Sequence, residues 1–282
     1  MPRIAQAPSI AQALRQAQAD GLERPDAQRL LGHLLQRERA WLIAHDDQTL
    51  NEPMASAFAD GCRRCAAGEP LAYVIGEQHF YGLRLLVTSA VLVPRPDTET
   101  LVDLALALLP TLARQQPRVL DLGTGSGAIA LAVAQGHGAA TVTATDISAD
   151  ALAVARANAQ RLGLPINLAQ GAWWQAVAAE QRFDLVLSNP PYIAADDANL
   201  SALQHEPLIA LSPGGDGLDA YRQIIAGAAA HLAPGGWLLF EHGWQQADAV
   251  SGLLRQAGFS RIDSRRDLAG RVRCTGGCLA PD

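Results

Sequence analysis

The spacing of apolar residues divides the 282-residue chain into a helical first part and a longer α/β part. Within residues 1–70, apolar side chains recur three and four positions apart, for example at residues 30–35, which predicts packed amphipathic helices. In residues 71–97, aromatic and β-branched residues alternate with glycines, and this pattern predicts a β-hairpin linker. Residues 98–282 alternate short apolar runs with Ala-rich stretches, which predicts a Rossmann-like α/β sheet covered by helices.

The apolar runs of the second part predict a sheet of about seven strands. The predicted strands are residues 118–120, 141–145, 167–170, 183–188, 236–241, 261–267 and 271–278. The predicted helices are residues 99–109, 128–134, 149–162, 218–232 and 247–257, and residues 194–211 are expected to form a long loop. In an open α/β sheet, ligands bind at the carboxyl ends of the strands, so polar residues that follow the predicted strands are candidate ligand-binding residues.

One such run, Asn189-Pro190-Pro191-Tyr192, follows the predicted strand at residues 183–188. The prolines fix φ and lack N–H groups, so their carbonyls are held in place and free to accept hydrogen bonds. Asn189 adds a side-chain oxygen acceptor, and Tyr192 adds an aromatic face. The run can therefore clamp a planar group that carries NH2, such as a carboxamide or the exocyclic amine of adenine or cytosine. The alternative is an ordinary turn, since Asn-Pro and Pro-Pro mark turns in many proteins.

A glycine-rich turn follows the first predicted strand of the sheet. It consists of Gly123, Thr124, Gly125, Ser126 and Gly127 and precedes an Ala-rich helix. A strand, a glycine turn and a helix make a nucleotide-binding unit, although the spacing differs from the Gly-x-Gly-x-x-Gly of dinucleotide enzymes. Asp146 ends the next strand, where a carboxylate can accept hydrogen bonds from ribose hydroxyls.

The order of these features resembles that of the class I S-adenosylmethionine-dependent methyltransferases. Three further runs are similar to the release factor glutamine methyltransferase (PrmC/HemK) family: LAYVIG at residues 71–76, FYGL at 80–83 and VLVPRPDTE at 91–99. The resemblance implies a seven-stranded methyltransferase fold, S-adenosyl-L-methionine as donor, S-adenosyl-L-homocysteine as product, and no metal. It also implies that the acceptor is the glutamine of the Gly-Gly-Gln motif in peptide chain release factors, methylated on its N5 nitrogen.

The resemblance also assigns domains and residues. Residues 1–70 would recognise the protein substrate, residues 71–97 would link the domains, and residues 98–282 would bind the donor. Donor binding would involve residues 123–127, Asp146, Asn189 and Trp173. The ring of Trp173 would pack on adenine; the alternative is that it packs in the hydrophobic core. Catalysis would involve Asn189, Pro190 and Tyr192, and the same residues with Pro191 would bind the acceptor. The chain departs from the family at Ala172, where Asp is common, and at Gln204-His205, where Arg-Phe is common.

Net charge and cysteine content indicate which ligands and which cell compartment to expect. The formal net charge of −6 argues against stable nucleic-acid binding, which needs a basic surface. A zinc site made of Cys62, Cys65, Cys274 and Cys278 would have to join the two ends of the chain, so we expect reduced thiols. The sequence shows neither a basic-then-apolar leader nor an apolar run of ~18 residues, so we expect neither export nor a membrane span. The reduced thiols suit a cytoplasmic protein, which we expect to be a monomer.

Three other functions remain open, namely an N6-adenine methyltransferase acting on DNA or RNA, a ribosomal-protein glutamine methyltransferase, and a non-catalytic cofactor-binding module. Several single residues also have two interpretations. Arg95, held between prolines, either faces a carboxylate or belongs to the turn before a helix that Asp97 or Thr98 caps. Glu241-His242 resembles an acid/base pair, but a structural role at a strand end is favoured.

Overall fold

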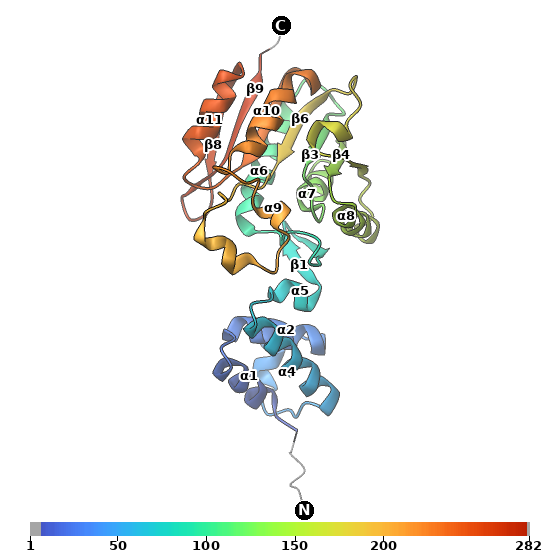
Figure 1. Cartoon of the computed structure of the whole chain (residues 1–282). Coiled ribbons are helices and arrows are strands. Elements are labelled where there is room, and N and C mark those ends of the chain that lie inside the picture. Colours follow the sequence, from blue (N-terminus) through green and yellow to red (C-terminus); the bar gives the residue numbers. More distant parts are fainter. Residues whose placement is uncertain (1–6, 281–282) are drawn as a thin grey trace, which may run out of the picture. The chain divides into compact units, whose positions relative to one another are not determined.

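The computed structural model describes residues 7–280, which fold as two compact units with their boundary after Gly76 (Figure 1). The first unit is helical, as the apolar spacing predicts. Ser9 and Gln12 form a capping box at the start of the first helix, and Asn51 caps the fourth. Its helices are α1 (Ile10–Ala19), α2 (Arg24–Leu35), α3 (Arg39–Ala44), α4 (Glu52–Ala66) and α5 (Leu71–Ile75).

The prediction of a hairpin throughout residues 71–97 is wrong at its start, because residues 71–75 form helix α5. The helix begins after Pro70 and ends at Gly76, whose φ of 80° suits a left-handed cap. Its apolar side chains pack on the core of the first unit, and this burial outweighs the strand preference of its aromatic and β-branched residues. The hairpin itself consists of β1 (Glu77–Phe80) and β2 (Leu83–Leu86).

The second unit is built on a seven-stranded sheet, so the predicted Rossmann-like α/β fold is confirmed. The strand order is β5-β4-β3-β6-β7-β9-β8, with five parallel strands and an antiparallel pair at one edge. The strands are β3 (Arg118–Leu122), β4 (Thr141–Asp146), β5 (Asn167–Gln170), β6 (Phe183–Ser188), β7 (Leu232–Glu241), β8 (Phe259–Arg266) and β9 (Val272–Leu279). The chain reverses its strand order at β3 and β6, which is where α/β sheets bind ligands.

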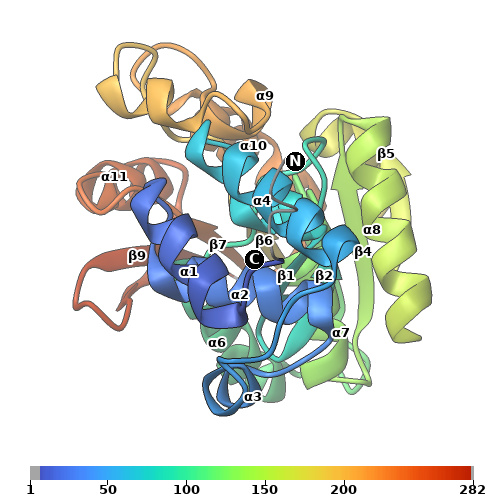
Figure 2. The same cartoon turned by 90° about the horizontal axis from the view of Figure 1, so that it is seen from below.

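Helices cover both faces of this sheet, and alternate residues of each strand supply two separate cores. On β6, Leu185 and Leu187 enter one core while Val186 enters the other. The first core contains side chains from α6 (Glu99–Leu108) and α7 (Ala128–Gly136), and α8 (Ala149–Leu162) packs at its edge, beside β4 and β5 in Figure 2. The second core contains side chains from α10 (Asp219–His231) and α11 (Ala247–Gln256).

Residues 194–211 are not the structureless loop that the sequence predicts. They contain a 3-10 helix, η4 (Ala198–Leu203), and the short helix α9 (Leu208–Leu211). Shorter 3-10 helices also occur at η1 (Pro96–Thr98), η2 (Leu109–Thr111) and η3 (Trp173–Ala176). Single turns of this kind carry too few apolar positions to produce a periodic signal in the sequence.

A buried asparagine connects three segments of the second unit. Asn158 of α8 accepts a hydrogen bond from the N–H of Leu86 and donates to the carbonyls of Leu86 and Ser126. Its side chain is fully buried, so these bonds replace all of its contacts with water. The end of the hairpin and the glycine turn are therefore held at a fixed distance from each other.

The four cysteines are free thiols, and burial is the main cause that raises the pKa of Cys62 to about 11. Such a thiol stays protonated and unreactive at neutral pH. Within residues 7–280, His, Cys, Asp and Glu side chains form no group of three that could hold a metal ion. No helix of that range is long and apolar enough to cross a membrane.

Candidate active site

A cavity of about 410 Å³ opens in the second unit where β3, β4 and β6 end. Its volume lies within the ~300–1,000 Å³ typical of small-molecule sites. The predicted site residues that line it are Gly123, Thr124, Gly125, Ser126, Asp146, Trp173, Asn189 and Pro191. Three others, Gly127, Pro190 and Tyr192, are not among the lining residues, and all these assignments of roles remain predictions.

The glycine turn adopts a backbone shape that only glycine accepts easily. Gly123, Gly125 and Gly127 have φ values of 74°, 55° and 83°. The N–H groups of Gly123 and Thr124 both donate to the carbonyl of Thr145 at 2.9 Å, which anchors the turn to β4. A Cβ added to Gly125 would meet no atom within 4 Å, so the turn leaves open space on its cavity side.

Asp146 connects the turn to the end of β4. One carboxylate oxygen accepts from the N–H of Gly125 at 2.9 Å, and the other accepts from the N–H of Ser148 at 2.9 Å. Two backbone donors therefore fix the orientation of the carboxylate at the cavity wall. Each oxygen has a further lone pair with which it can accept from a ligand hydroxyl.

Asp121, at the end of β3, hydrogen-bonds to the glycine turn, and its sequence context did not predict a function for it. Its side chain is fully buried, and one oxygen accepts from the Thr124 hydroxyl at 2.6 Å. Burial raises the pKa of Asp121 to about 7, against the hydrogen bond from Thr124, which lowers it. The second oxygen has no hydrogen-bond partner within residues 7–280. Asp121 therefore stabilises the turn through Thr124 rather than by lining the cavity.

Trp173 forms one wall of the cavity and also packs on the core. The ring lies 3.4 Å from the position that a Cβ on Gly123 would take, so it covers the face of the glycine turn. It also contacts the α10/α11 core, which means that the two interpretations of Trp173 do not exclude each other. Trp174 points the other way, donating to the Ile224 carbonyl at 2.8 Å and stacking on His231.

The Asn-Pro-Pro-Tyr run continues directly from β6. Asn189 lines the cavity, and its Nδ2 donates to the hydroxyl oxygen of Thr98 at 3.4 Å. Pro190 is buried, and the ring of Tyr192 is half-buried against the α10/α11 core. The backbone N–H of Tyr192 donates to the Leu211 carbonyl at 3.1 Å, which joins the run to α9.

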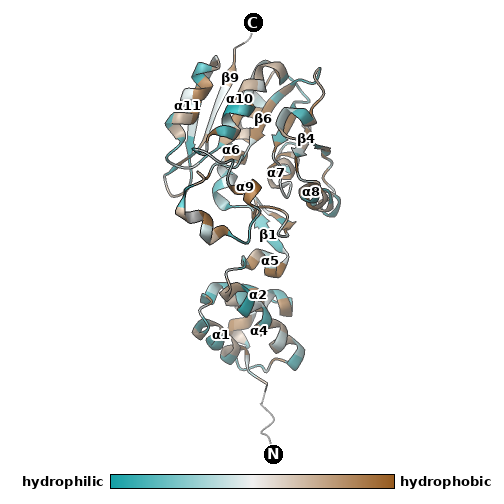
Figure 3. Cartoon of the chain, viewed as in Figure 1, coloured by the Kyte–Doolittle hydropathy of each residue, from teal (hydrophilic) through white to brown (hydrophobic). Residues whose placement is uncertain are grey.

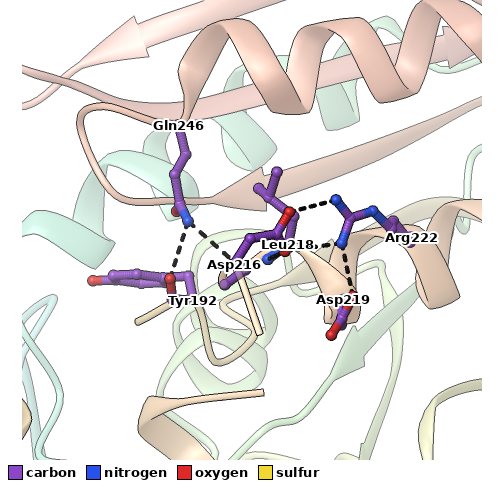
Figure 4. A network of polar contacts seen from close by, with 7 residues as sticks. Tyr192, Asp216, Leu218, Asp219, Arg222 and Gln246 are labelled. Atoms are coloured by element: carbon purple, nitrogen blue, oxygen red, sulfur yellow. Dashed lines mark hydrogen bonds and ion pairs between the residues drawn. The ribbon is translucent and has the colours of Figure 1, made fainter. Parts of the chain in front are cut away.

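Gln246 fixes the far end of this run, as Figure 4 shows. Its Nε2 donates to the carbonyl of Tyr192 at 3.0 Å and to that of Gly217 at 3.5 Å. A Cβ on Gly217 would lie 2.4 Å from the Tyr192 carbonyl oxygen, so only glycine permits this approach. Beside it, Arg222 pairs with Asp216 and Asp219 on the surface.

The segment before α6 differs from its prediction. Thr98 occupies the N-cap position of α6 as predicted, but its side chain makes no capping hydrogen bond. Asp97 does not cap the helix and pairs with Arg273 of β9 at 2.9 Å. The expectation that Arg95 faces a carboxylate is confirmed, because it pairs with Glu206. Glu206 also accepts from the N–H of Val93 at 3.0 Å, so residues 194–211 are joined to this segment.

The fold and the site define a class I methyltransferase domain. Residues 99–250 match the family model described as methyltransferase small domain, and residues 9–76 match the PrmC N-terminal domain. The solved structure of a methyltransferase from Pyrococcus furiosus has the same fold, with a TM-score of 0.53 and 20% identity over 79% of this chain and 99% of that chain.

Curated relatives identify the family more closely. The release factor glutamine methyltransferase of Bordetella pertussis is 51% identical over 92% of this chain and 96% of its own length. That of Xylella fastidiosa (strain Temecula1) is 48% identical over 94% of this chain and 96% of its own length. The chain therefore belongs to the release factor glutamine methyltransferase family, and the resemblance drawn from its motifs is confirmed.

Proposed function

We propose that this protein transfers a methyl group from S-adenosylmethionine to the side-chain nitrogen of a glutamine, the one in the Gly-Gly-Gln motif of a peptide chain release factor. The proposal rests on one observation: Asn189 lines the same cavity as the glycine turn and Asp146, in a chain 51% identical to a release factor glutamine methyltransferase. We further propose that it acts as a cytoplasmic monomer and requires no metal.

The residues that line the cavity are suited to binding S-adenosylmethionine. The open side of the glycine turn offers room for the amino-acid part, the Asp146 carboxylate can accept from ribose hydroxyls, and the Trp173 ring can stack on adenine. Ala172 also lines the cavity, where its methyl group offers no hydrogen bond to the adenine amine. When bound, the donor supplies an electrophilic methyl group, and the protein supplies binding and orientation.

The acceptor amide needs activation, because its nitrogen lone pair is delocalised into the carbonyl group. The Asn189 side-chain oxygen and the Pro190 carbonyl can accept its two N–H bonds and thereby aim the nitrogen at the methyl group. Both acceptors favour the tetrahedral nitrogen over the planar one and stabilise the positive charge that develops on it. Pro191 and the ring of Tyr192 would hold the flat face of the amide.

The surroundings of the cavity favour a protein acceptor over a nucleic acid. Ile147 and Ile209 line the cavity while remaining 51% and 58% exposed, and Leu208 beside them is 65% exposed. Helix α9 is accordingly brown in Figure 3. Single-stranded nucleic acid requires a basic groove with stacking aromatics, whereas an apolar rim suits a peptide loop. We propose that the helical first unit provides a second contact with the release factor.

Competition among acceptors tests this function. Purified release factor, its Gly-Gly-Gln→Gly-Gly-Ala variant, a glutamine-containing ribosomal protein and single-stranded DNA are offered together with labelled donor. We expect label in the intact release factor alone. Label in DNA or in the ribosomal protein at the expense of the release factor would refute the proposal.

A further inference from the structure

Helix α9 forms part of the cavity wall although little apolar burial holds it there. Ile209 and Ala210 line the cavity, while Leu208 and Ile209 are 65% and 58% exposed. Of the four residues of this helix, Leu211 alone is buried. A helix of a single turn is unstable by itself in water, so the position of α9 depends on what holds its two ends.

The C-terminal end of α9 is joined to the Asn-Pro-Pro-Tyr run. The carbonyl oxygen of Leu211 accepts from the N–H groups of Tyr192 at 3.1 Å and of Ile193 at 2.9 Å. The next residue, Ser212, donates its hydroxyl proton to the Ile193 carbonyl at 2.6 Å. These three bonds fix one end of the helix to the segment that follows Asn189.

The N-terminal end of α9 is held by the side chain of Glu206, which precedes the N-cap residue Pro207. This side chain is 2% exposed, and Glu206 is not among the residues that line the cavity. Its Oε2 accepts from the N–H of Val93 at 3.0 Å, and its Oε1 pairs with Arg95. A buried carboxylate is costly unless donors satisfy it, and here each oxygen has a donor.

The segment that Glu206 binds has anchors of its own. Val93 is 4% exposed, so its side chain lies within the protein. The carbonyl of Pro94 accepts from Gln78 Nε2 at 3.3 Å. We therefore expect this segment to stay in place without Glu206, whereas the start of α9 would lose both of its bonds to it.

We propose that Glu206 is a positioning residue that holds α9 in the cavity wall, where Ile209 and Ala210 contact the acceptor peptide. The contact with the acceptor rests on the proposed function, whereas the position of α9 does not. Without Glu206, the acceptor has to order this wall as it binds, and the cost of ordering weakens its binding. Donor binding changes little, because β4 holds both the glycine turn and Asp146.

Hydrogen exchange of the full-length protein tests the position of α9 without any catalysis. The N–H groups of Ala210 and Ser212 donate to carbonyls at the start of the helix at 2.9 and 3.0 Å, so their exchange reports this turn. We expect exchange roughly tenfold faster in Glu206→Ala than in the wild type, and an intermediate rate in Glu206→Gln, which keeps one acceptor oxygen. Equal rates in the wild type and Glu206→Ala would overturn the proposal, as would a wild-type helix that exchanges like an unfolded peptide.

Asp267 provides the matched control, because it is another buried carboxylate with partners of the same kinds. Its side chain is 3% exposed, its Oδ1 accepts from the N–H of Arg271 at 2.9 Å, and its Oδ2 accepts from Arg273 Nε at 3.2 Å. None of these three residues lines the cavity. Asp267→Ala should therefore leave the exchange of α9 and the acceptor KM near their wild-type values.

Steady-state kinetics with purified release factor test the consequence for turnover. Glu206→Ala should raise the acceptor KM roughly tenfold to a hundredfold, since two bonds to a charged group are lost, and Glu206→Gln should raise it less. Donor affinity and kcat at saturating acceptor should stay within about threefold of the wild type, as expected for a loss of acceptor binding. A fall in kcat with an unchanged acceptor KM, or an equal rise of KM in Asp267→Ala, would contradict the positioning role.

The two proposals fail separately. Wild-type protein that labels no release factor refutes the function, while hydrogen exchange still decides whether Glu206 positions α9. If exchange in Glu206→Ala is faster but the acceptor KM is unchanged, the role in acceptor binding is refuted. Unchanged exchange together with an unchanged acceptor KM refutes the positioning and leaves the function intact.

Discussion

Glu241→Gln is expected to make the protein more stable at alkaline pH. Glu241 is 1% exposed, and its Oε2 has no hydrogen-bond partner within the described part of the chain. Ionising such a group in the folded protein is unfavourable because water no longer solvates the charge. Glutamine has nearly the same shape and stays neutral, so it avoids this penalty.

The magnitude follows from the pKa of Glu241, which burial raises from the ordinary 4.5 to about 7. Between these values the folded state holds a proton that the unfolded chain has released, so its stability falls as pH rises. The penalty is absent below about 4.5 and complete above about 7. At 1.36 kcal/mol per pH unit, it amounts to roughly 3 kcal/mol of unfolding free energy. Asp121, whose pKa is raised in the same direction by burial, is present in both proteins and cancels from the comparison.

Urea unfolding followed by tryptophan fluorescence measures this difference. Trp41 lies in the first unit and the other four tryptophans lie in the second, so both proteins carry Trp41→Phe to report the second unit alone. The advantage of Glu241→Gln over its parent should grow by roughly 3 kcal/mol between about pH 4.5 and about pH 8.5. Parallel pH dependence in the two proteins would refute the reasoning, because Glu241 would then ionise equally in the folded and unfolded states.

Three further predictions follow from the site. Asp146→Ala should weaken donor binding by about tenfold to a hundredfold in calorimetry, since two backbone N–H groups lose their acceptor, while the circular dichroism spectrum stays unchanged. Asn158→Leu should lower the unfolding free energy by about 2–4 kcal/mol in urea, and a loss below 1 kcal/mol would contradict its role as a buried connector. Gly217→Ala should lower turnover by displacing the Tyr192 carbonyl, whereas Gly214→Ala, which has a similar positive φ but no atom within 4 Å of its Cβ, should affect stability alone.

Much of the sheet was predictable because its central strands β3, β6 and β7 contain runs of apolar residues. β6 is buried at every position and is apolar except for Asp184 and the terminal Ser188, so the place of Asn189 at its end follows directly. In the same way, the strand predicted at residues 141–145 placed Asp146 at the end of β4. Strand ends in a parallel sheet share one edge, which is why two short motifs 43 residues apart in the sequence (189 − 146) could be assigned to one cavity.

Thr98 shows what sequence reasoning misses. Its place before a helix indicated a cap, yet its hydroxyl accepts a hydrogen bond from Asn189, 91 residues away in the sequence. Local preferences describe the bonds a side chain can make nearby, and they contain no information about partners that tertiary packing supplies. Helix α5 was missed for a related reason, since packing on a core decides between helix and strand in a five-residue apolar segment.

The most direct test of the proposed function is the site of methylation on the acceptor. Release factor incubated with the protein and S-adenosylmethionine is digested and analysed by tandem mass spectrometry, with the Asn189→Ala protein as control. We predict one added methyl group on the side-chain nitrogen of the Gly-Gly-Gln glutamine, at a rate about a hundredfold lower with Asn189→Ala. A methyl group on another residue, or equal rates with the two proteins, would contradict the account.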